Sequence, residues 1–294
     1  MLNLSEQLLQ LLMSGLTLGS IYALIALALV TTFNITGILN LAQGEFAALG
    51  ALLAASLCAA GLPLAASFVI SVVAVAILGG LIERSAIHPA RQASGLILII
   101  ITLGLSISLR GLALLIWGTD PVLIPAFSKS GPFHIGGAAL GSQSLWIFGM
   151  LVVTVVGLHA FFELTYFGKV VRACVINQTA ARLVGINPAL MSLLAFTGSG
   201  ALGAAAGIFI TPVTLATYDM GFMLGIKGFV AAIIGGMNSV AGAVLGGIIL
   251  GVLEACSAGL ISSGLKDALA LIVLLAVLLV RPEGLIGAGS GRKV

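Results

Sequence analysis

Charged side chains are what this sequence lacks most. Only 7% of its 294 residues are Asp, Glu, Lys or Arg, whereas 60% are hydrophobic. Soluble globular domains carry about 25% charged residues, so water could not solvate a fold with this much apolar surface. The shortage of charge excludes a soluble protein and predicts a chain surrounded by lipid.

Cysteine and histidine are also scarce. The three cysteines, Cys58, Cys174 and Cys256, lie far apart and have neither metal-ligand spacing nor a paired disulfide pattern. The three histidines fall in different segments, and no Ser/His/Asp or paired-carboxylate pattern stands beside them. We therefore predict no catalytic site and no metal site.

Nucleotide-binding motifs are missing as well. The chain has no GxxxxGK[ST] sequence, so it cannot supply its own P-loop ATPase. The GxGxxG match at 198–203 lies inside an apolar stretch, with no preceding strand, and indicates helix packing. We expect no cofactor on this chain. Because the amino terminus carries Glu6 and lacks a basic region, we do not expect a cleaved signal peptide.

Long apolar runs are abundant. In lipid, backbone groups must be paired within a helix or a closed barrel, and runs such as 96–101 and 268–280 are apolar on every face, which favours helices. We predict an all-α polytopic membrane protein, with residues 1–294 as a single transmembrane domain.

A span needs about 20 apolar residues. The candidates are 8–33, 38–60, 63–83, 95–117, 145–163, 191–212, 222–237, 240–258 and 266–281. Because 222–237 is short and Gly-rich at its end, the region 222–258 could be re-entrant, and we predict eight or nine spans.

Glycine is frequent, with 39 residues. Membrane helices rely on small residues to pack closely, and the small-xxx-small spacing recurs. The pairs are Gly15/Gly19, Gly203/Gly207, Gly221/Gly225, Gly242/Gly246 and Gly247/Gly251. A tightly packed bundle is the expectation.

Most basic residues fall in three segments: 84–94, 164–190 and the carboxyl-terminal tail. Lys and Arg concentrate in cytoplasmic loops, and an even number of spans separates the first two segments. We predict that all three are cytoplasmic, that 118–144 faces outward and that the amino terminus is outside.

Four charged residues fall within or at the edges of predicted spans: Glu45, Arg110, Lys227 and Glu254. Each costs about 2.5–3.5 kcal/mol at a helix centre, so such residues face the bundle interior or a water-filled path. One interpretation is a polar translocation route. The other is structural ion pairing, for example of Glu45 with Lys227, which occupy matching places in a weak internal repeat. Arg110 could instead snorkel to the outer interface.

The segment 164–190 predicts a cytoplasmic surface helix with its apolar residues on one face. Gly185, followed by Asn187-Pro188, indicates a helix stop and a new start. The apolar face could lie on lipid or dock into a groove on a partner protein.

The chain resembles LivH-type permease subunits of branched-chain amino-acid ABC importers. The resemblance spans nearly the whole length. It is carried by GLTLGSIYALIALALV (15–30), ILNLAQGEF (38–46), LIIITLGLSISLRGLALLIWGTDP (98–121), the RAC…ARLVGINP loop (172–188), YDMGFMLGIKGFVAAIIGGMNSVAGAVLGGIILGVLEA (218–255) and LLVRPEGLIG (278–287).

The resemblance implies an ABC importer permease fold in a bacterial inner membrane. It also implies partners: a periplasmic amino-acid-binding protein, a second homologous permease subunit, and two cytoplasmic ATPase subunits that bind ATP and Mg²⁺. The 164–190 loop would couple to the ATPase through Arg172, Asn177, Ala180, Ala181 and Gly185. In alternating access, Arg110 or Lys227 would meet the substrate carboxylate and Glu45 the ammonium group.

Two other functions remain open at this level. The same architecture could import urea, short amides or other amino acids. An ion-coupled secondary transporter would instead work without ATPase subunits.

Overall fold

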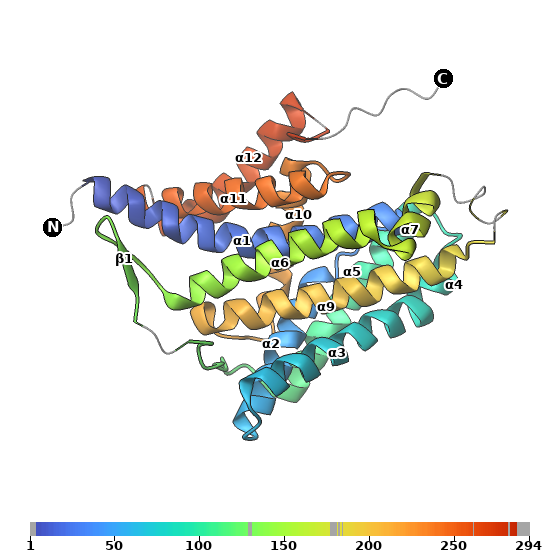
Figure 1. Cartoon of the computed structure of the whole chain (residues 1–294), viewed down its shortest axis with the longest axis horizontal. Helices are drawn as coiled ribbons and strands as arrows, with labels where there is room; N and C mark the ends of the chain where they lie inside the picture. Colours follow the sequence, from blue (N-terminus) through green and yellow to red (C-terminus); the bar gives the residue numbers. More distant parts are fainter. Residues whose placement is uncertain are drawn as a thin grey trace. The chain divides into compact units, whose positions relative to one another are not determined.

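The computed structural model describes residues 4–128, 131–176, 181, 183, 185–260, 262–281 and 283–286. Apart from one short β-hairpin, the regular elements of this part of the chain are helical (Figure 1). In chain order they are α1 (Leu4–Thr36), α2 (Gln43–Ala59), α3 (Leu64–Ile82), the π-helical turn η1 (Glu83–Ile87), α4 (His88–Ala90), α5 (Gly95–Trp117), β1 (Phe133–Ile135), β2 (Ala138–Leu140), α6 (Ser142–Leu164), α7 (Tyr166–Ile176), α9 (Pro188–Thr214), α10 (Met220–Gly235), α11 (Val240–Leu260), η2 (Ser263–Leu265) and α12 (Lys266–Val280).

Each predicted span coincides with a helix, and the all-α membrane fold is confirmed. By length and composition, six helices of the described residues can cross a membrane: α1, α3 with its extension to Ala90, α5, α6, α9 and α11. The helices α2 and α10 and residues 270–280 of α12 are shorter and apolar. The span predicted at 38–60 begins late, because Gly37 leaves α1 at φ +71° and the Asn40 side chain accepts a hydrogen bond from the Ala42 N–H at 3.1 Å. The helix α2 therefore starts at Gln43.

The chain divides into two compact units. The first comprises Met1–Val30, Ala126–Leu151 and Lys227–Val294, and the second Thr31–Pro125 and Val152–Ile226. The helices α1, α6 and α10 contribute residues to both units.

In the first unit, α1 and α11 pack in antiparallel directions through glycines. A Cβ atom added to Gly15 would lie 2.7 Å from the Cα atom of Val252, and one added to Gly19 would lie 2.8 Å from that of Ile248. From the other side, Gly247 faces Ala23 and Gly251 faces Gly19. Two of the predicted small-residue pairs, Gly15/Gly19 on α1 and Gly247/Gly251 on α11, therefore form the two sides of one helix–helix contact.

The helices α10 and α11 form a tight hairpin in the first unit. Gly235 and Gly242 touch each other's backbones, and Gly246 touches Ala231. After α12 the chain returns to this hairpin: the backbone N–H groups of Leu285 and Ile286 donate to the carbonyls of Ile234 and Gly235, at 2.8 and 3.0 Å. These bonds satisfy carbonyls that the end of α10 would otherwise leave unpaired.

The core of the second unit is the packing of α2, α3 and α9. A Cβ atom on Gly50 would lie 2.5 Å from the Cα atom of Ala204, and one on Gly79 would lie 2.5 Å from the Phe196 carbonyl oxygen. Gly200 within the GxGxxG match packs against Val75 of α3, with the α3 carbonyl 2.7 Å from its Cβ position. The interpretation of that motif as helix packing is confirmed.

The end of α3 widens into a π-helical turn. The N–H of His88 bonds to the carbonyl of Glu83, five residues earlier. Pro89 follows at once, and in an α-helix its ring would clash with the carbonyl four residues back. The wider turn relieves this clash, and π-helical turns of this kind are frequent at functional sites.

Candidate functional site

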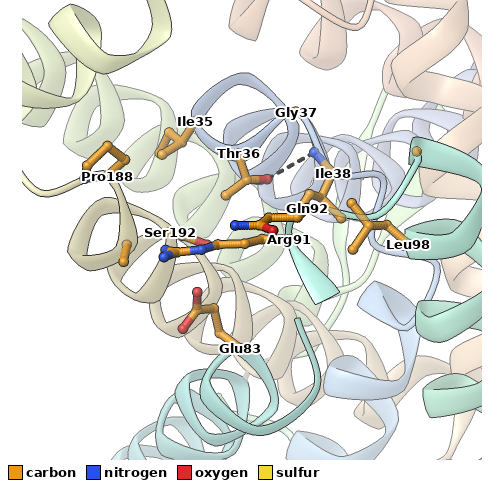
Figure 2. Close-up of a pocket in the computed structure, with 12 residues that line it drawn as sticks. Ile35, Thr36, Gly37, Ile38, Glu83, Arg91, Gln92, Leu98, Pro188 and Ser192 are labelled. Atoms are coloured by element: carbon orange, nitrogen blue, oxygen red, sulfur yellow. Dashed lines mark hydrogen bonds between the residues drawn. The ribbon is translucent and has the colours of Figure 1, made fainter. Parts of the chain in front are cut away.

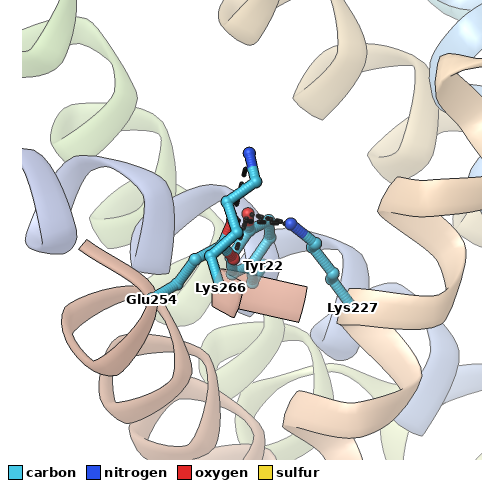
Figure 3. Close-up of polar contacts among 4 residues, drawn as sticks. All are labelled: Tyr22, Lys227, Glu254 and Lys266. Carbon is cyan, nitrogen blue, oxygen red and sulfur yellow. Dashed lines mark hydrogen bonds and ion pairs between the residues drawn. The ribbon is translucent and has the colours of Figure 1, made fainter. Parts of the chain in front are cut away.

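The first unit holds a buried polar cluster centred on Glu254, whose side chain is 3% exposed. Lys227 Nζ lies 2.6 Å from Glu254 Oε1, and the Tyr22 hydroxyl donates a hydrogen bond to Oε2 at 2.8 Å (Figure 3). Lys266 Nζ is a more distant cation, 3.9 Å from Oε1 and 43% exposed. Both carboxylate oxygens therefore have donors.

Helix packing explains why this cluster forms. Tyr22 lies three residues after Gly19 on α1, and Glu254 three residues after Gly251 on α11, so both lie on the faces that the glycines bring together. Helical side chains lean toward the amino terminus of their own helix. In an antiparallel pair these two side chains lean toward each other.

The second unit holds a separate charge pair. Glu45, near the start of α2, is 2% exposed and accepts a hydrogen bond from the Ser106 hydroxyl at 2.8 Å. Arg110, one turn later on α5, places its Nε 3.5 Å from the same Glu45 oxygen. The Arg110 guanidinium carbon lies 4.5 Å from the centre of the Phe222 ring, within cation–π range.

Glycines bring the first turns of the two short helices α2 and α10 into contact beside Glu45. A Cβ atom on Gly44 would overlap the carbonyl oxygen of Gly221 and lie 2.5 Å from the nitrogen of Gly225. A Cβ on Gly221 would lie 2.5 Å from Glu45 Oε2. Two helix amino termini, each with a partial positive charge, thus lie close to the Glu45–Arg110 pair.

All four predicted intramembrane charges are paired, but with partners that differ from the example given by the sequence. Lys227 pairs with Glu254 rather than with Glu45, and Arg110 pairs with Glu45 rather than extending alone to an interface. Sequence periodicity cannot show which helices are neighbours, so the partners could not be read from it.

Sequence reasoning missed three side chains that complete these pairs: Tyr22, Ser106 and Phe222. The signal for Ser106 was its place four residues before Arg110 on one helix face. The signal for Tyr22 was its position one turn after Gly19.

The 164–190 loop is partly described. Its helix α7 buries Val171 and Cys174 against Ile35, Met191 and Ala195 of α1 and α9. The apolar face of α7 therefore packs within the second unit, rather than on lipid or on a partner as the sequence left open, because the ends of α1 and α9 already offer an apolar surface. Burial raises the pKa of the Cys174 thiol above its ordinary value.

Of the predicted coupling residues, Asn177 and Ala180 lie outside the described residues. Arg172 pairs with Glu163 at 2.6 Å, and both are exposed. Ala181 is buried, whereas Leu183 is 85% exposed. Gly185 has φ +85°, and the Ile186 N–H donates to the Ala181 carbonyl at 3.0 Å.

The predicted stop and restart at the end of the loop is confirmed. Asn187 caps α9, its side-chain oxygen accepting from the Ala189 N–H at 3.0 Å, and Pro188 occupies the first turn.

Comparison with known proteins shows extensive similarity. The sequence model of a family described as "Branched-chain amino acid transport system / permease component" matches residues 11–280. The high-affinity branched-chain amino acid transport system permease protein LivH of Salmonella typhimurium is 34% identical, over 99% of this chain and 100% of that protein. The corresponding permease protein BraD of Pseudomonas aeruginosa is 33% identical, over 97% and 98%.

The fold is shared more widely. The solved structure of PsaBC from Streptococcus pneumoniae, in complex with Fab, contains a chain that superposes with a TM-score of 0.54 at 14% identity. The superposition covers 92% of this chain and 91% of the other.

Proposed function

Because this chain belongs to the family of permease components of branched-chain amino acid transport systems, we propose that it is the membrane subunit through which an ATP-driven importer moves leucine, isoleucine or valine. The observation that carries the proposal is the match to LivH and BraD along almost the whole of each protein. The single permease domain would be a multi-pass component of the inner membrane, with its amino terminus outside and its carboxyl terminus in the cytoplasm.

The buried charges suit this cargo. Leu, Ile and Val have apolar side chains, so a route for them needs few polar groups, chiefly for the ammonium and carboxylate. Glu45, Arg110, Lys227 and Glu254 are our candidates for that role. Ionisable side chains within membrane spans mark solute pathways more often than lipid-facing surfaces.

The proposed partners are a periplasmic amino-acid-binding protein, a second and homologous permease subunit, and two ATPase subunits. ATP and Mg²⁺ would bind to the ATPase subunits and not to this chain. The loop from Arg172 to Gly185 would contact the ATPase, and Leu183 offers it an exposed apolar side chain. Closure of the ATPase pair would then move the ends of α7 and α9, which the loop joins.

Reconstitution tests the proposal. Liposomes that contain this permease, its partner permease and the ATPase subunits should accumulate L-leucine when ATP and the binding protein are supplied. The chain reconstituted without ATPase subunits should accumulate none, whatever ion gradient is imposed. Uptake by the chain alone would establish a secondary transporter and overturn the proposal.

A second candidate keeps the architecture and changes the cargo. The fructose import permease protein FruF of Bifidobacterium longum is 28% identical over 53% of this chain, so related membrane subunits serve other solutes. Urea, short amides and other amino acids are the alternatives. A ligand profile of the cognate binding protein in which leucine, isoleucine and valine all fail to bind would favour this candidate.

Gly185→Val should uncouple the importer. A β-branched residue is strained at φ +85°, and the turn that Gly185 makes leads directly into α9. We expect ATP-driven leucine uptake to fall several-fold while ATP hydrolysis and membrane abundance stay near normal. Gly157→Val, at an open and exposed position on α6, is the matched control. Equal uptake by the two variants would contradict the coupling role.

A further inference from the structure

A pocket of about 430 Å³ lies in the second unit, where the end of α1, the segment after α3 and the start of α9 meet (Figure 2). This volume falls in the range of about 300–1,000 Å³ that is typical of small-molecule sites. The predicted cytoplasmic segments 84–94 and 164–190 adjoin it. The pocket is distinct from the Glu45 and Glu254 pairs, since neither of these residues lines it.

The pocket contains one acid and one base. Glu83 is 2% exposed, and its carboxylate points into the pocket from the π-helical turn (Figure 2). The Nδ1 atom of His88 lies 3.8 Å from a Glu83 oxygen, beyond hydrogen-bond distance, and no other described side chain hydrogen-bonds or pairs with Glu83. Arg91 is exposed and lines the same pocket without pairing with Glu83 among the described residues. A buried carboxylate with so few donors is costly unless a cation meets it.

The remaining lining suits a short ligand with one apolar end. Ile38 and Leu98 form an apolar wall, and both side chains are almost fully buried. Ser192 of α9 and Gln92 add polar groups near Arg91 (Figure 2). The Thr36 hydroxyl is already engaged, because it accepts a hydrogen bond from the Ile38 N–H at 3.1 Å.

We propose that this pocket binds a free α-amino acid with an aliphatic side chain, with Glu83 meeting the ammonium group, Arg91 the carboxylate, and Ile38 with Leu98 the side chain. The inference rests on the proposed function for its ligand class and for the side of the membrane that the pocket faces. On the cytoplasmic side the pocket acts as a binding site. Amino acid that has accumulated in the cytoplasm contacts the residues between α3 and α5 and the start of α9.

Such a site links the cytoplasmic amino-acid concentration to the coupling loop. Arg91 also lines a neighbouring hollow of about 300 Å³ together with Gly185 and Ile186. Arg91 thus lines both the pocket and the hollow beside the turn that begins α9. A ligand whose carboxylate draws the Arg91 guanidinium toward it therefore also affects that turn. Occupancy by product is in a position to slow the importer.

The test is protection of a reporter cysteine in the complete permease–ATPase complex, held in lipid nanodiscs without binding protein. The reporter is Ser192→Cys, with Cys58→Ser and Cys256→Ser to remove background. Cys174 stays, because it is 1% exposed and its thiol pKa is raised. L-leucine should slow maleimide labelling. At equal concentration, leucinol, which lacks the carboxylate, and 4-methylpentanoate, which lacks the ammonium, should not.

Charge variants locate the ligand. Arg91→Gln and Glu83→Gln should each raise the L-leucine concentration needed for protection about tenfold or more, since each removes a charge-assisted hydrogen bond. Arg84→Gln, exposed on the same turn and absent from the pocket lining, should leave it unchanged. Arg91→Gln alters an exposed side chain, so its result stands even where Glu83→Gln fails to assemble.

The outcomes separate this inference from the proposed function. Equal protection by all three compounds, no protection, or protection indifferent to Arg91→Gln would overturn the pocket assignment. If the same complex, reconstituted in liposomes, accumulates leucine with ATP, that result leaves the proposed function intact. Protection in a complex that does not transport leucine would support the pocket and count against the proposed function.

Discussion

Lys227→Met is expected to lower the free energy of unfolding by about 3–5 kcal/mol, the usual cost of leaving one member of a buried ion pair alone. Glu254 would keep the hydrogen bond from the Tyr22 hydroxyl. The cation nearest to its Oε1 atom would then be Lys266 Nζ at 3.9 Å, in place of Lys227 Nζ at 2.6 Å. Unfolding of the purified protein in micelles of increasing dodecyl sulfate fraction measures the change.

A second variant makes this prediction specific. Lys227→Met combined with Glu254→Gln should regain most of the lost stability, because the glutamine still accepts from Tyr22 and no buried charge is left over. If the double variant is as unstable as the single one, the cost does not come from an unpaired carboxylate. Leucine uptake by a stable double variant then separates the two interpretations of this charge pair: retained uptake marks a structural pair, and lost uptake marks a group on the route.

Gly207→Ala is expected to cost about 3 kcal/mol or more. The added Cβ atom would overlap the backbone carbonyl of Ala47 on α2. Overpacking a close-packed interior typically costs 1–3 kcal/mol where side chains can shift, and here a helix backbone must move instead. Because α2 carries Glu45, the displacement should also weaken the Glu45–Arg110 pair and reduce uptake.

Gly198→Ala is the matched control on the same helix. Its added Cβ atom meets nothing within 4 Å, so the substitution should leave stability unchanged or raise it slightly through better helix propensity. Membrane abundance and unfolding midpoint in detergent, measured side by side, give the comparison. Similar losses for both variants would show that the α2–α9 contact at Gly207 does not determine the effect, since helix propensity alone predicts a gain at both positions.

The sequence predicted the helices well because length and apolarity are local properties. The runs that became α5 and α9 are long, uniformly apolar and bounded by loop residues. In lipid such a run forms a helix, because only a helix pairs all of its backbone groups within the segment. The family was also predicted, since motifs such as ILNLAQGEF are specific in combination, and this prediction is confirmed. The glycine pairs predicted close packing, though not which helices pack.

The parts that could not be predicted depend on contacts distant in sequence. Nothing near Glu45 indicates that Arg110 lies opposite, because their helices are separated by α3. Likewise the apolar face of α7 looks available in sequence, and only the ends of α1 and α9 show that it is covered. The sequence placed Arg91 in a basic segment and assigned Glu83 no role, because the pocket that they line depends on the π-helical turn and on residues of α9 that lie about a hundred positions later.

The backbone hydrogen bonds from Leu285 and Ile286 to the end of α10 close a ring in the polypeptide without a covalent bond. The stretch from Ile234 to Ile286 leaves α10, runs through α11 and α12, and returns to its starting point. The entropy lost in closing such a loop grows only slowly with its length, and two backbone hydrogen bonds together with the contact of Gly284 with Gly236 join its ends. In polymer terms, α12 is tethered at both ends and cannot drift from the hairpin as a free terminal helix would.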